Sequence, residues 1–293
     1  MTKSAKQTES FAQEIIVVTG TSTGIGNATA KELASRGYYV LAGVRRDIDA
    51  DAIRGTNIEP VILDITNQIH ITNLVKRIKK DPEKRLLRAL INNAAIEINA
   101  PLEVLHLSEW RRQFEVNVFG QVAMIQALLP SLFQSRGTIV NISSIGGKAA
   151  MAGYGPYAST KFALEGLSDA LRRELQPFGV KVIVIEPGGV TSPMSLQVRS
   201  KAEKITNEMT SEQRSRYGGL MYAMVSLAES YIKNAVSAEK AGQIIANTIT
   251  NKRTHTRYTI GQDAAMVRFM NWILPDRILD KLLAQSNKSH YPS

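Results

Sequence analysis

Short apolar runs alternate with longer amphipathic stretches along most of the chain. The runs are rich in β-branched residues and short enough to be buried strands, whereas the longer stretches carry apolar residues at helical spacing. The predicted strands span Glu14–Thr19, Tyr38–Val44, Ile58–Leu63, Leu86–Asn92, Thr138–Ser143, Val180–Glu186 and Arg257–Ile260. Helices are predicted around Ala28–Ala34 and at Gln68–Lys79, Ser108–Leu129, Tyr157–Gln176, Ala238–Thr250 and Ala264–Leu283, the last broken at Pro275. This alternation predicts an α/β fold: one doubly wound parallel sheet with helices on both faces.

The pattern changes towards both ends of the chain. Residues 1–13 are polar, lack the apolar core of a signal peptide, and are expected to form a tail ahead of a single domain at 14–293. Residues 194–235 are polar and helical in propensity, which favours a mobile lid over a solvated helical excursion. Residues 262–293 are expected to be a helical extension that packs on the core or on another subunit, with a membrane surface as the less favoured alternative.

Residues suited to ligand binding follow the predicted strands. Gly20, Asp64, Asn92, Ser144 and Pro187 each come at the end of a different strand. Because parallel strands end at one edge of a sheet, these residues are expected to converge there, where open α/β sheets bind their ligands.

The first strand leads into a glycine-rich turn and then into a helix. Gly20, Gly24 and Gly26 allow a tight turn and a close approach of the backbone to a ligand. The helix N-terminus offers free N–H groups to a phosphate. This context favours a dinucleotide site over the alternative, an ordinary glycine turn.

A second group of residues is suited to proton transfer. Tyr157 and Lys161 are four residues apart in a predicted helix, so both can point at one spot. A nearby ammonium lowers the pKa of a tyrosine from about 10 towards the range where proton transfer is efficient. Ser144 could hold a carbonyl or alcohol oxygen beside them. The group suits an oxidoreductase, and the alternative is an amphipathic helix with an exposed tyrosine and lysine.

Composition narrows the possible functions. The chain has 293 residues, 44% of them hydrophobic, which is enough for one large core, and the absence of cysteine excludes disulfides and thiolate metal sites. No apolar run approaches the roughly 18 residues that span a bilayer, and the histidines are too widely spaced to predict a metal site. The net charge is +10, but no tract of basic residues is interleaved with aromatic residues. This favours a basic surface that only contacts water over one that binds nucleic acid.

Over roughly residues 14–262 the chain resembles the short-chain dehydrogenases/reductases, in the subgroup marked by TGxxxGxG and YxxxK. The matching residues are Thr19, Gly20, Gly24, Ile25, Gly26, Asp64, Asn92, Asn93, Ala94, Asn117, Ser144, Tyr157, Lys161, Pro187 and Gly188. Ala95 departs from the pattern, because the family usually has glycine there. The resemblance implies a Rossmann-type catalytic domain.

The resemblance also implies catalytic roles. Tyr157 would be the general acid/base, and Lys161 would lower its pKa and bind the nicotinamide ribose. Ser144 would hold the substrate oxygen, since it and not Ser143 has the family's separation from the tyrosine. Asn117 resembles the residue that anchors a water in the proton relay, the alternative being a buried asparagine at a helix irregularity.

The cofactor would lie along the sheet edge. Asp64 resembles the residue that contacts the adenine amino group, Asn92 would stabilise the sheet beside the cofactor, and Val190 and Thr191 would meet the nicotinamide carboxamide. The full set expected to bind cofactor is Gly20, Ser22, Thr23, Gly24, Ile25, Gly26, Arg45, Arg46, Asp64, Ile65, Asn93, Ala94, Tyr157, Lys161, Pro187, Gly188, Val190 and Thr191.

The end of the second strand predicts the choice of cofactor. Relatives specific for NAD carry an acidic residue there that binds both ribose hydroxyls. In this chain the position is Val44, followed by Arg45 and Arg46. Guanidinium groups suit the 2′-phosphate of NADP, so NADP is expected; the alternative is two solvated arginines.

The expected function is an NADP(H)-dependent interconversion of an alcohol with a ketone or aldehyde. Met194, Leu196, Leu220, Met221, Tyr222 and Met224 predict an apolar pocket for a bulky lipophilic substrate such as a steroid or retinoid. A homodimer or homotetramer in the cytoplasm is expected. A non-catalytic dinucleotide-binding regulator and a membrane-surface protein are the alternatives.

Overall fold

The structure is a computed structural model that describes residues 13–251 and 253–291. Apart from Gln13, the predicted N-terminal tail lies outside the described residues. The Gln13 side-chain amide donates hydrogen bonds to the Gly37 carbonyl (2.9 Å) and to Asn57 Oδ1 (3.0 Å). The described part of the chain therefore begins where it joins the domain.

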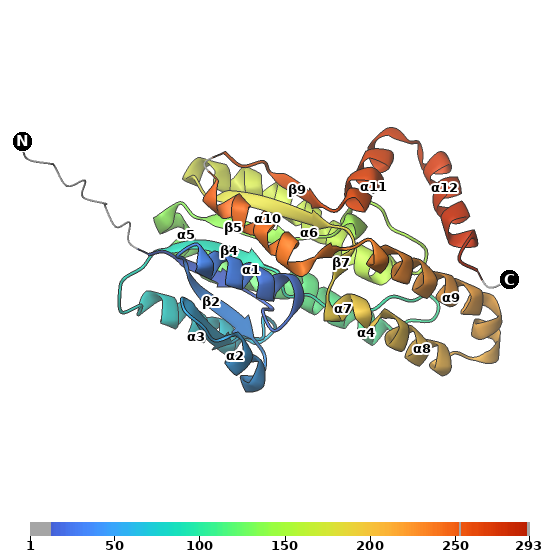
Figure 1. Ribbon diagram of the computed structural model, residues 1–293, viewed down its shortest axis with the longest axis horizontal. Coiled ribbons are helices and arrows are strands. Elements are labelled where there is room, and N and C mark those ends of the chain that lie inside the picture. Colours follow the sequence, from blue (N-terminus) through green and yellow to red (C-terminus); the bar gives the residue numbers. More distant parts are fainter. Residues whose placement is uncertain (1–12, 252, 292–293) are drawn as a thin grey trace, which may run out of the picture.

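A seven-stranded parallel sheet forms the centre of the domain, in the order β3-β2-β1-β4-β5-β6-β9 (Figure 1). The strands are β1 (Ile15–Val18), β2 (Tyr39–Val44), β3 (Ile58–Ile62), β4 (Leu87–Asn92), β5 (Thr138–Ile142), β6 (Lys181–Pro187) and β9 (Arg257–Ile260). The strand order reverses between β1 and β4, and doubly wound sheets bind ligands at such a reversal. The predicted fold class is confirmed.

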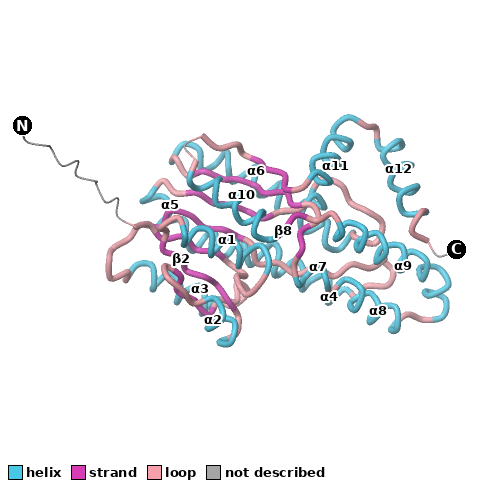
Figure 2. The backbone as a smooth tube through the Cα atoms, in the orientation of Figure 1, coloured by secondary structure: helices cyan, strands magenta, loops and turns pink. Residues whose placement is uncertain are grey.

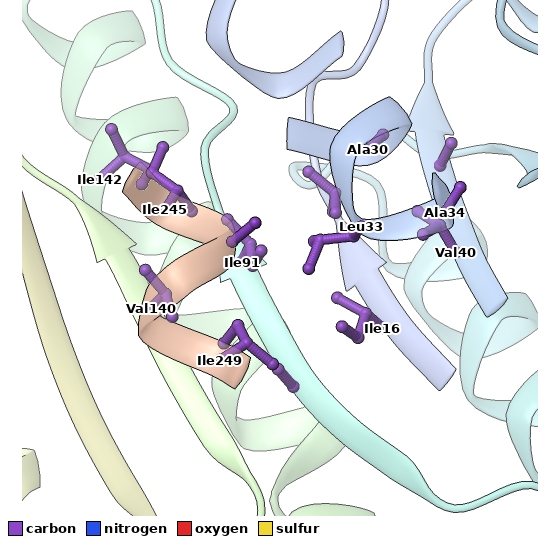
Figure 3. Close-up of a cluster of buried hydrophobic side chains, with 14 of the residues drawn as sticks. Ile16, Ala30, Leu33, Ala34, Val40, Ile91, Val140, Ile142, Ile245 and Ile249 are labelled. Carbon is purple, nitrogen blue, oxygen red and sulfur yellow. The ribbon is translucent and has the colours of Figure 1, made fainter. Parts of the chain in front are cut away.

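Helices cover both faces of the sheet. On one face lie α1 (Gly24–Ser35), α2 (Asp47–Ile53) and α10 (Ala238–Thr250), and on the other lie α3 (Gln68–Lys79), α5 (Gln121–Ser135) and α6 (Gly155–Leu175). Successive strand residues point to opposite faces. In β1, Ile16 and Val18 therefore join the core beneath α1 and α10, whereas Ile15 and Val17 join the other core. Figure 3 shows the first core, with α1 and α10 packed side by side on the sheet.

The closest approach of α1 and α10 requires a glycine. A Cβ at Gly242 would lie 2.8 Å from the Ala28 carbonyl carbon and 2.9 Å from the Thr29 backbone nitrogen. Gly242 therefore lets two helices that are distant in the sequence pack with their backbones almost in contact.

Five further helices gather at the end of the molecule away from β2 and α3 (Figure 2). They are α7 (Pro193–Leu196), α8 (Val198–Glu208), α9 (Ser211–Lys233), α11 (Gln262–Ile273) and α12 (Asp276–Lys288). A two-stranded sheet of β7 (Val190–Thr191) and β8 (Val236–Ser237) joins the two ends of the α7–α9 excursion. The predicted break at Pro275 separates α11 from α12.

The long helix predicted at Ser108–Leu129 is composite and longer than expected. It consists of α4 (Leu107–Phe114), a π-helical segment η1 (Glu115–Gly120) and α5, which continues through Pro130 to Ser135. By length and composition alone Leu107–Ser135 could cross a membrane, contrary to the expectation that no such segment exists. Core helices pass the same test, and this one packs on the sheet, so the observation is weak evidence for a membrane span.

Candidate active site

The glycine turn after β1 is held by side chains from the next strand of the sheet. Thr19 Oγ1 accepts hydrogen bonds from the backbone N–H groups of Asn93 (3.0 Å) and Ala94 (2.9 Å). Asn93 Nδ2 donates to the carbonyls of Thr19 (2.9 Å) and Gly20 (3.0 Å). A Cβ at Gly26 would clash with Asn93 Nδ2 and the Gly20 carbonyl, so the turn closes only with glycine there. Asn93, expected to bind cofactor, thus shapes the turn with its side chain.

The N-terminus of α1 is open to a ligand. Gly20 and Gly24 have φ of 68° and 60°, a left-handed conformation that favours glycine. Thr23 precedes the helix, but its side chain makes no capping hydrogen bond. The first N–H groups of α1 are therefore left for an anion, and Ser22, Thr23 and Ile25 lie partly or fully exposed around them.

Two arginines follow β2, and the structure distinguishes them. Arg46 is bound to Asp49 by two hydrogen bonds of 2.7 Å. Arg45 is exposed and makes no side-chain hydrogen bond or ion pair within the described residues, although its charge helps to lower the pKa of Asp64. Val44 is buried at the end of β2 and carries no acidic group that could bind the ribose hydroxyls.

Asp64 and Ile65 follow β3 at the same edge of the sheet. Burial raises the pKa of Asp64, but hydrogen bonds from the Thr66 hydroxyl (2.7 Å) and amide (2.9 Å) outweigh it, so the net shift is downward. The side chain of Ile65 is buried in the core beneath α3 and α5, so only its backbone can face a cofactor.

Tyr157, Ser144 and Lys161 come together at the ends of β5 and α6. Ser143, the alternative serine, is buried, whereas Ser144 is partly exposed and lies beside the tyrosine ring. Lys161 is 1% exposed and donates from Nζ to the Ile142 carbonyl (2.8 Å). Its Nζ lies 5.6 Å from the centre of the Tyr157 ring. The structure therefore places all three side chains in one site.

The expectation that Lys161 lowers the pKa of Tyr157 is not met in this arrangement. Burial raises the pKa of Tyr157, the negative charge of Glu97 raises it further, and the nearby Ser144 hydroxyl lowers it only in part. Burial also lowers the pKa of Lys161 to about 8, against the opposing effect of Glu97 and Glu165. Removal from water is therefore the largest influence on the pKa of both groups, and Tyr157 is protonated at neutral pH.

Asn117 lies in the π-helical segment and is fully buried. Its Oδ1 accepts from the Ile96 N–H (2.9 Å), and its Nδ2 donates to the Ile96 carbonyl (2.8 Å) and to Thr160 Oγ1 (3.1 Å). Thr160 Oγ1 in turn donates to the Tyr157 carbonyl (2.7 Å). The asparagine therefore does sit at a helix irregularity, and its side chain connects the segment after β4 to the helix of Tyr157.

The segment after β6 is held by the C-terminal extension. Gly189 donates its N–H to Asp263 Oδ2 (2.7 Å), and a Cβ at Gly188 would clash with the same carboxylate. Gly188 also donates its N–H to the Ile260 carbonyl (2.8 Å). Val190 is buried and Thr191 exposed, so only the threonine side chain is accessible. Pro187 is the last residue of β6.

Asn92 and Ala94, at and just after the end of β4, contact neighbouring elements of the site. Asn92 donates from Nδ2 to Asn141 Oδ1 (3.0 Å), and Asn141 donates to Ser168 Oγ (2.9 Å), so Asn92 ties β4 to β5 and α6. Ala94 lies so close to Gly20 that a Cβ on the glycine would be 2.8 Å from the Ala94 Cα. Both residues therefore help to hold the edge of the sheet at which the cofactor is expected to bind.

An apolar cluster lies between the α7–α9 excursion and the segment after β4. Its members are Ala100, Leu105, Met209, Met221 and Met224, with Ile98, Val104, Trp110, Tyr154, Ala202, Ile205, Tyr217 and Leu220 packed against them. Of the residues expected to line a pocket, Leu220, Met221 and Met224 belong to this cluster. Leu196 and Tyr222 are 65% and 54% exposed and face solvent instead.

The fold and this site define a dinucleotide-binding enzyme with a tyrosine positioned for acid/base chemistry. The family model described as short chain dehydrogenase matches residues 14–203. The chain belongs to the short-chain dehydrogenase family, whose members are oxidoreductases, and the predicted resemblance is confirmed.

Three similar proteins illustrate the relationship. The NADPH-dependent 3-dehydrocapnine reductase of Ornithobacterium rhinotracheale is 31% identical, with 93% of this chain and 96% of that protein covered. Retinol dehydrogenase 16 of Mus musculus is 32% identical, with 92% and 87% covered. A short-chain dehydrogenase structure from Streptomyces avermitilis has a TM-score of 0.73 and 27% identity, and covers 96% of this chain and 98% of its own.

Proposed function

We propose that the protein is an NADP(H)-dependent oxidoreductase that interconverts an alcohol and a ketone or aldehyde on a lipophilic substrate. The observation that carries the proposal is the position of Tyr157 and Lys161, side by side at the sheet edge that also holds the open N-terminus of α1. The alternative of a non-catalytic regulator would not require a protonated tyrosine, a buried lysine and a partly exposed serine in one place.

The site has residues suited to the proton transfer and room for the cofactor that carries out the hydride transfer. When bound, the nicotinamide cofactor supplies or accepts the hydride. In the reductive direction Tyr157, whose pKa is raised by burial, donates a proton to the carbonyl oxygen. Ser144 orients that oxygen by a hydrogen bond, and Lys161 holds positive charge beneath the site, fixed by the Ile142 carbonyl. The reverse reaction uses the same groups with the proton moving to the tyrosine.

The preference for NADP over NAD is assigned to Arg45. Arg45 follows β2 without a partner among the described residues, whereas Arg46 is occupied by Asp49. A free guanidinium at the end of the second strand can bind the 2′-phosphate that distinguishes NADP. One of the similar proteins is itself described as NADPH-dependent, which supports the same choice.

The helices α7–α9 are assigned the role of a substrate lid. Lys201 of α8 donates to the Glu97 carbonyl (3.2 Å), and Arg216 and Tyr217 of α9 bind Glu103 (2.6 and 2.8 Å). These polar contacts lie at the edge of the excursion, while its apolar residues meet the segment after β4. The apolar residues suit a lipophilic substrate. The α7–α9 excursion can open when water replaces a few of its exposed hydrogen bonds.

The assembly is proposed to be a homodimer or homotetramer located in the cytoplasm. Phe119 of η1 and Phe162 of α6 are 58% and 45% exposed on neighbouring elements. Exposed aromatic residues on adjacent helices are suited to subunit packing. No nucleic-acid partner is proposed.

The decisive experiment follows the absorbance of the reduced nicotinamide. The purified protein would be mixed with NADPH or NADH and a panel of long-chain, steroid, retinoid and small polar carbonyl compounds. Oxidation of NADPH that depends on a lipophilic carbonyl is expected. Binding of NADPH without turnover of any carbonyl would favour the non-catalytic regulator, and a clear preference for small polar sugars would refute the lipophilic substrate.

A further inference from the structure

The loop that carries Ser144 lies against one face of α6. It continues from Ser144 into a single short helical turn, η2 (Ile145–Gly147). A Cβ on Gly146 would lie 3.4 Å from Ser144 Oγ and 3.7 Å from Tyr157 Cε1, so the turn is close to both side chains. The position of η2 on α6 therefore determines how Ser144 and Tyr157 face each other.

The next two residues contact α6 further along the same face. A Cβ on Gly147 would lie 3.1 Å from the Lys161 carbonyl oxygen and 3.1 Å from Glu165 Cγ, so the turn and the helix are closely packed. Lys148 Nζ forms an ion pair with Glu165 Oε2 at 2.7 Å. Tyr157, Lys161 and Glu165 follow one another at four-residue spacing in α6, and residues at this spacing share one side of a helix.

Glu165 is also held from the sheet. Arg257 of β9 donates from Nε to Glu165 Oε2 (3.1 Å) and pairs with Asp169, one turn further along α6 (2.8 Å). Glu186 of β6 lies between the two cations, with its Oε1 3.5 Å from Lys148 Nζ and 3.4 Å from Arg257 Nε. Glu165 is therefore fixed between a strand of the sheet and the loop that carries Ser144.

Burial makes this network hold Lys148 in place. Glu165 and Glu186 are 5% and 0% exposed, so their charges are removed from water. A buried ion pair adds little net stability, but the loss of one partner leaves an uncompensated charge in the interior. If Lys148 moved away from α6, both carboxylates would lose one of their cations. The contact therefore restricts where the loop can lie.

We propose that Glu165 is a positioning residue for the reaction. By holding Lys148 it keeps the loop after β5 on α6, and so keeps Ser144 where it and Tyr157 reach one substrate oxygen. Glu165 acts through the loop and touches neither substrate nor cofactor. This inference rests on the proposed oxidoreductase function and adds the contact that aligns the two groups on that oxygen.

The test uses two variants that break the same contact with opposite changes of charge. Glu165→Gln removes a negative charge, and Lys148→Met removes a positive one. Both are expected to lower kcat about 10- to 100-fold and to leave NADPH affinity unchanged, because a small displacement of a catalytic group has an effect of this size. The assay follows NADPH oxidation with the carbonyl compound of the panel that the wild-type protein reduces fastest.

A double variant tests whether the loss passes through the serine. When Glu165→Gln is added to Ser144→Ala, kcat should fall by no more than about twofold further, because the effects of coupled sites do not add. Asp169→Asn is the matched control. In the described part of the chain Asp169 pairs with Arg172 and Arg257 but with no residue of the loop at 144–148, so this variant should keep its kcat.

Amide hydrogen exchange measures the loop without any substrate. The Gly147 and Lys148 amides donate to the carbonyls of Ser144 and Ile145 (both 2.9 Å). Both amides should exchange faster in Glu165→Gln and in Lys148→Met than in the wild type, while those of α6 do not change. Thermal unfolding reports the folding of each variant separately, and Lys148 is partly exposed, so its replacement does not open the core.

Three outcomes would overturn the inference. Wild-type kcat or unchanged loop exchange in either single variant would show that the ion pair does not hold the loop. Opposite changes of kcat in the two would show that Glu165 acts by its charge on Lys161. Losses that multiply with Ser144→Ala would show that it does not act through the serine. A wild-type protein that reduces no carbonyl would refute the proposed oxidoreductase instead, and hydrogen exchange would still test the loop.

Discussion

At the scale of single residues, the site depends on which polar groups have partners and which do not. Arg45 and Arg46 are adjacent and identical in type, yet within the part of the chain that the structure describes only Arg46 is paired, with Asp49. Ser143 and Ser144 are also adjacent, yet only Ser144 is accessible beside Tyr157. Neighbouring residues in a sequence can therefore differ completely in chemical role, because the fold buries or pairs one and leaves the other free.

Replacing Tyr157 by Phe is expected to abolish turnover and leave NADPH binding nearly intact, because only the proton donor is lost. A loss of general acid catalysis corresponds to about a 100- to 10,000-fold lower kcat. Tyr258→Phe is the control, since among residues 13–251 and 253–291 that hydroxyl binds only the exposed His255 backbone N–H (2.8 Å). Steady-state kinetics and titration of NADPH fluorescence measure the two effects. If Tyr157→Phe kept more than about a tenth of wild-type turnover, the acid role would be wrong.

Replacing Arg45 by Ala is expected to weaken NADPH binding about 10- to 100-fold, because a charged hydrogen bond contributes about 1.5–3 kcal/mol, and to change NADH binding little. Arg46→Ala is the matched control and should have a smaller effect, since Asp49 already holds Arg46. The double variant Val44→Asp with Arg45→Ala should reverse the preference by repelling the 2′-phosphate. Equal affinity of the wild-type protein for NADH and NADPH would contradict the assignment of Arg45.

At the scale of helices and strands, a few close contacts determine how elements distant in the sequence pack together. Gly242 allows the backbones of α1 and α10 to meet, and the carboxylate of Asp263 holds the loop after β6. Asp81 and Arg85, both buried after α3, join the end of that helix to the start of β4. Each of these contacts fixes the position of one helix, strand or loop relative to another.

Gly242→Ala is expected to destabilise the fold. Its new methyl group would meet backbone atoms of α1 that cannot rotate away, and overpacking of this kind costs about 1–3 kcal/mol. Gly218→Ala in α9 is the control, because a Cβ there meets only the Arg214 side chain at 3.7 Å, an ordinary contact, and should stabilise the helix by about 0.5–1 kcal/mol. Urea unfolding measures both. Similar effects of the two substitutions would show that α1 and α10 do not pack this closely.

Asp81→Asn is expected to destabilise the protein at neutral pH and to remove part of its acid sensitivity. Hydrogen bonds from Arg85 lower the pKa of Asp81, only partly opposed by its burial, so its contribution is fully present above the unfolded pKa of about 4 and is lost as the pH falls. Asparagine keeps an acceptor oxygen but loses the charge, and Arg85 still has Glu83 at 3.7 Å and Gln13 at 3.2 Å, so the substitution costs about 1.5–3 kcal/mol.

The control for Asp81 is Glu109→Gln, which breaks an exposed pair with Arg112 and should cost less than about 1 kcal/mol. Urea unfolding at neutral and acidic pH would be compared for the wild type and both variants. An acid dependence in Asp81→Asn as steep as that of the wild type would contradict the role of Asp81.

At the scale of the whole molecule, helices cover both faces of the sheet, and the helices α11 and α12 project from one end of this layered unit (Figure 1). Several apolar side chains on this projection are exposed, among them Phe269 and Trp272 at 59% and 80%. Together with Phe119 and Phe162 they give the described surface more than one apolar region suited to contact with another subunit.

The assembly is expected to be a homodimer or homotetramer that depends on the face formed by η1 and α6. Phe162→Asp should shift the protein towards a monomer, because it places a charge where apolar packing is expected. Ile48→Asp is the control, since Ile48 is 71% exposed on α2, at the opposite end of the sheet order. Sedimentation velocity at micromolar concentration measures the change. A monomeric wild-type protein would refute the expectation.

The sequence by itself determined the order and type of nearly every strand and helix that positions the site. Apolar periodicity is a local property, so β9, α3 and α10 were predicted with the bounds observed. The four-residue spacing of Tyr157 and Lys161 likewise follows from helix geometry alone. The short helix α2 was missed, because its seven residues are too few to show a helical pattern.

Tertiary structure alone decided which of the predicted residues are free to act. The pKa of Tyr157 depends on burial and on Glu97, sixty residues earlier in the chain, and not on the nearby lysine. The contacts of Asn117 with Ile96 also become visible only when distant segments meet, whereas the pairing of Arg46 with Asp49 is local and depends on the short helix α2. Local sequence determines which element forms and what it carries, whereas solvation and partners come from contacts across the fold, which no local pattern contains.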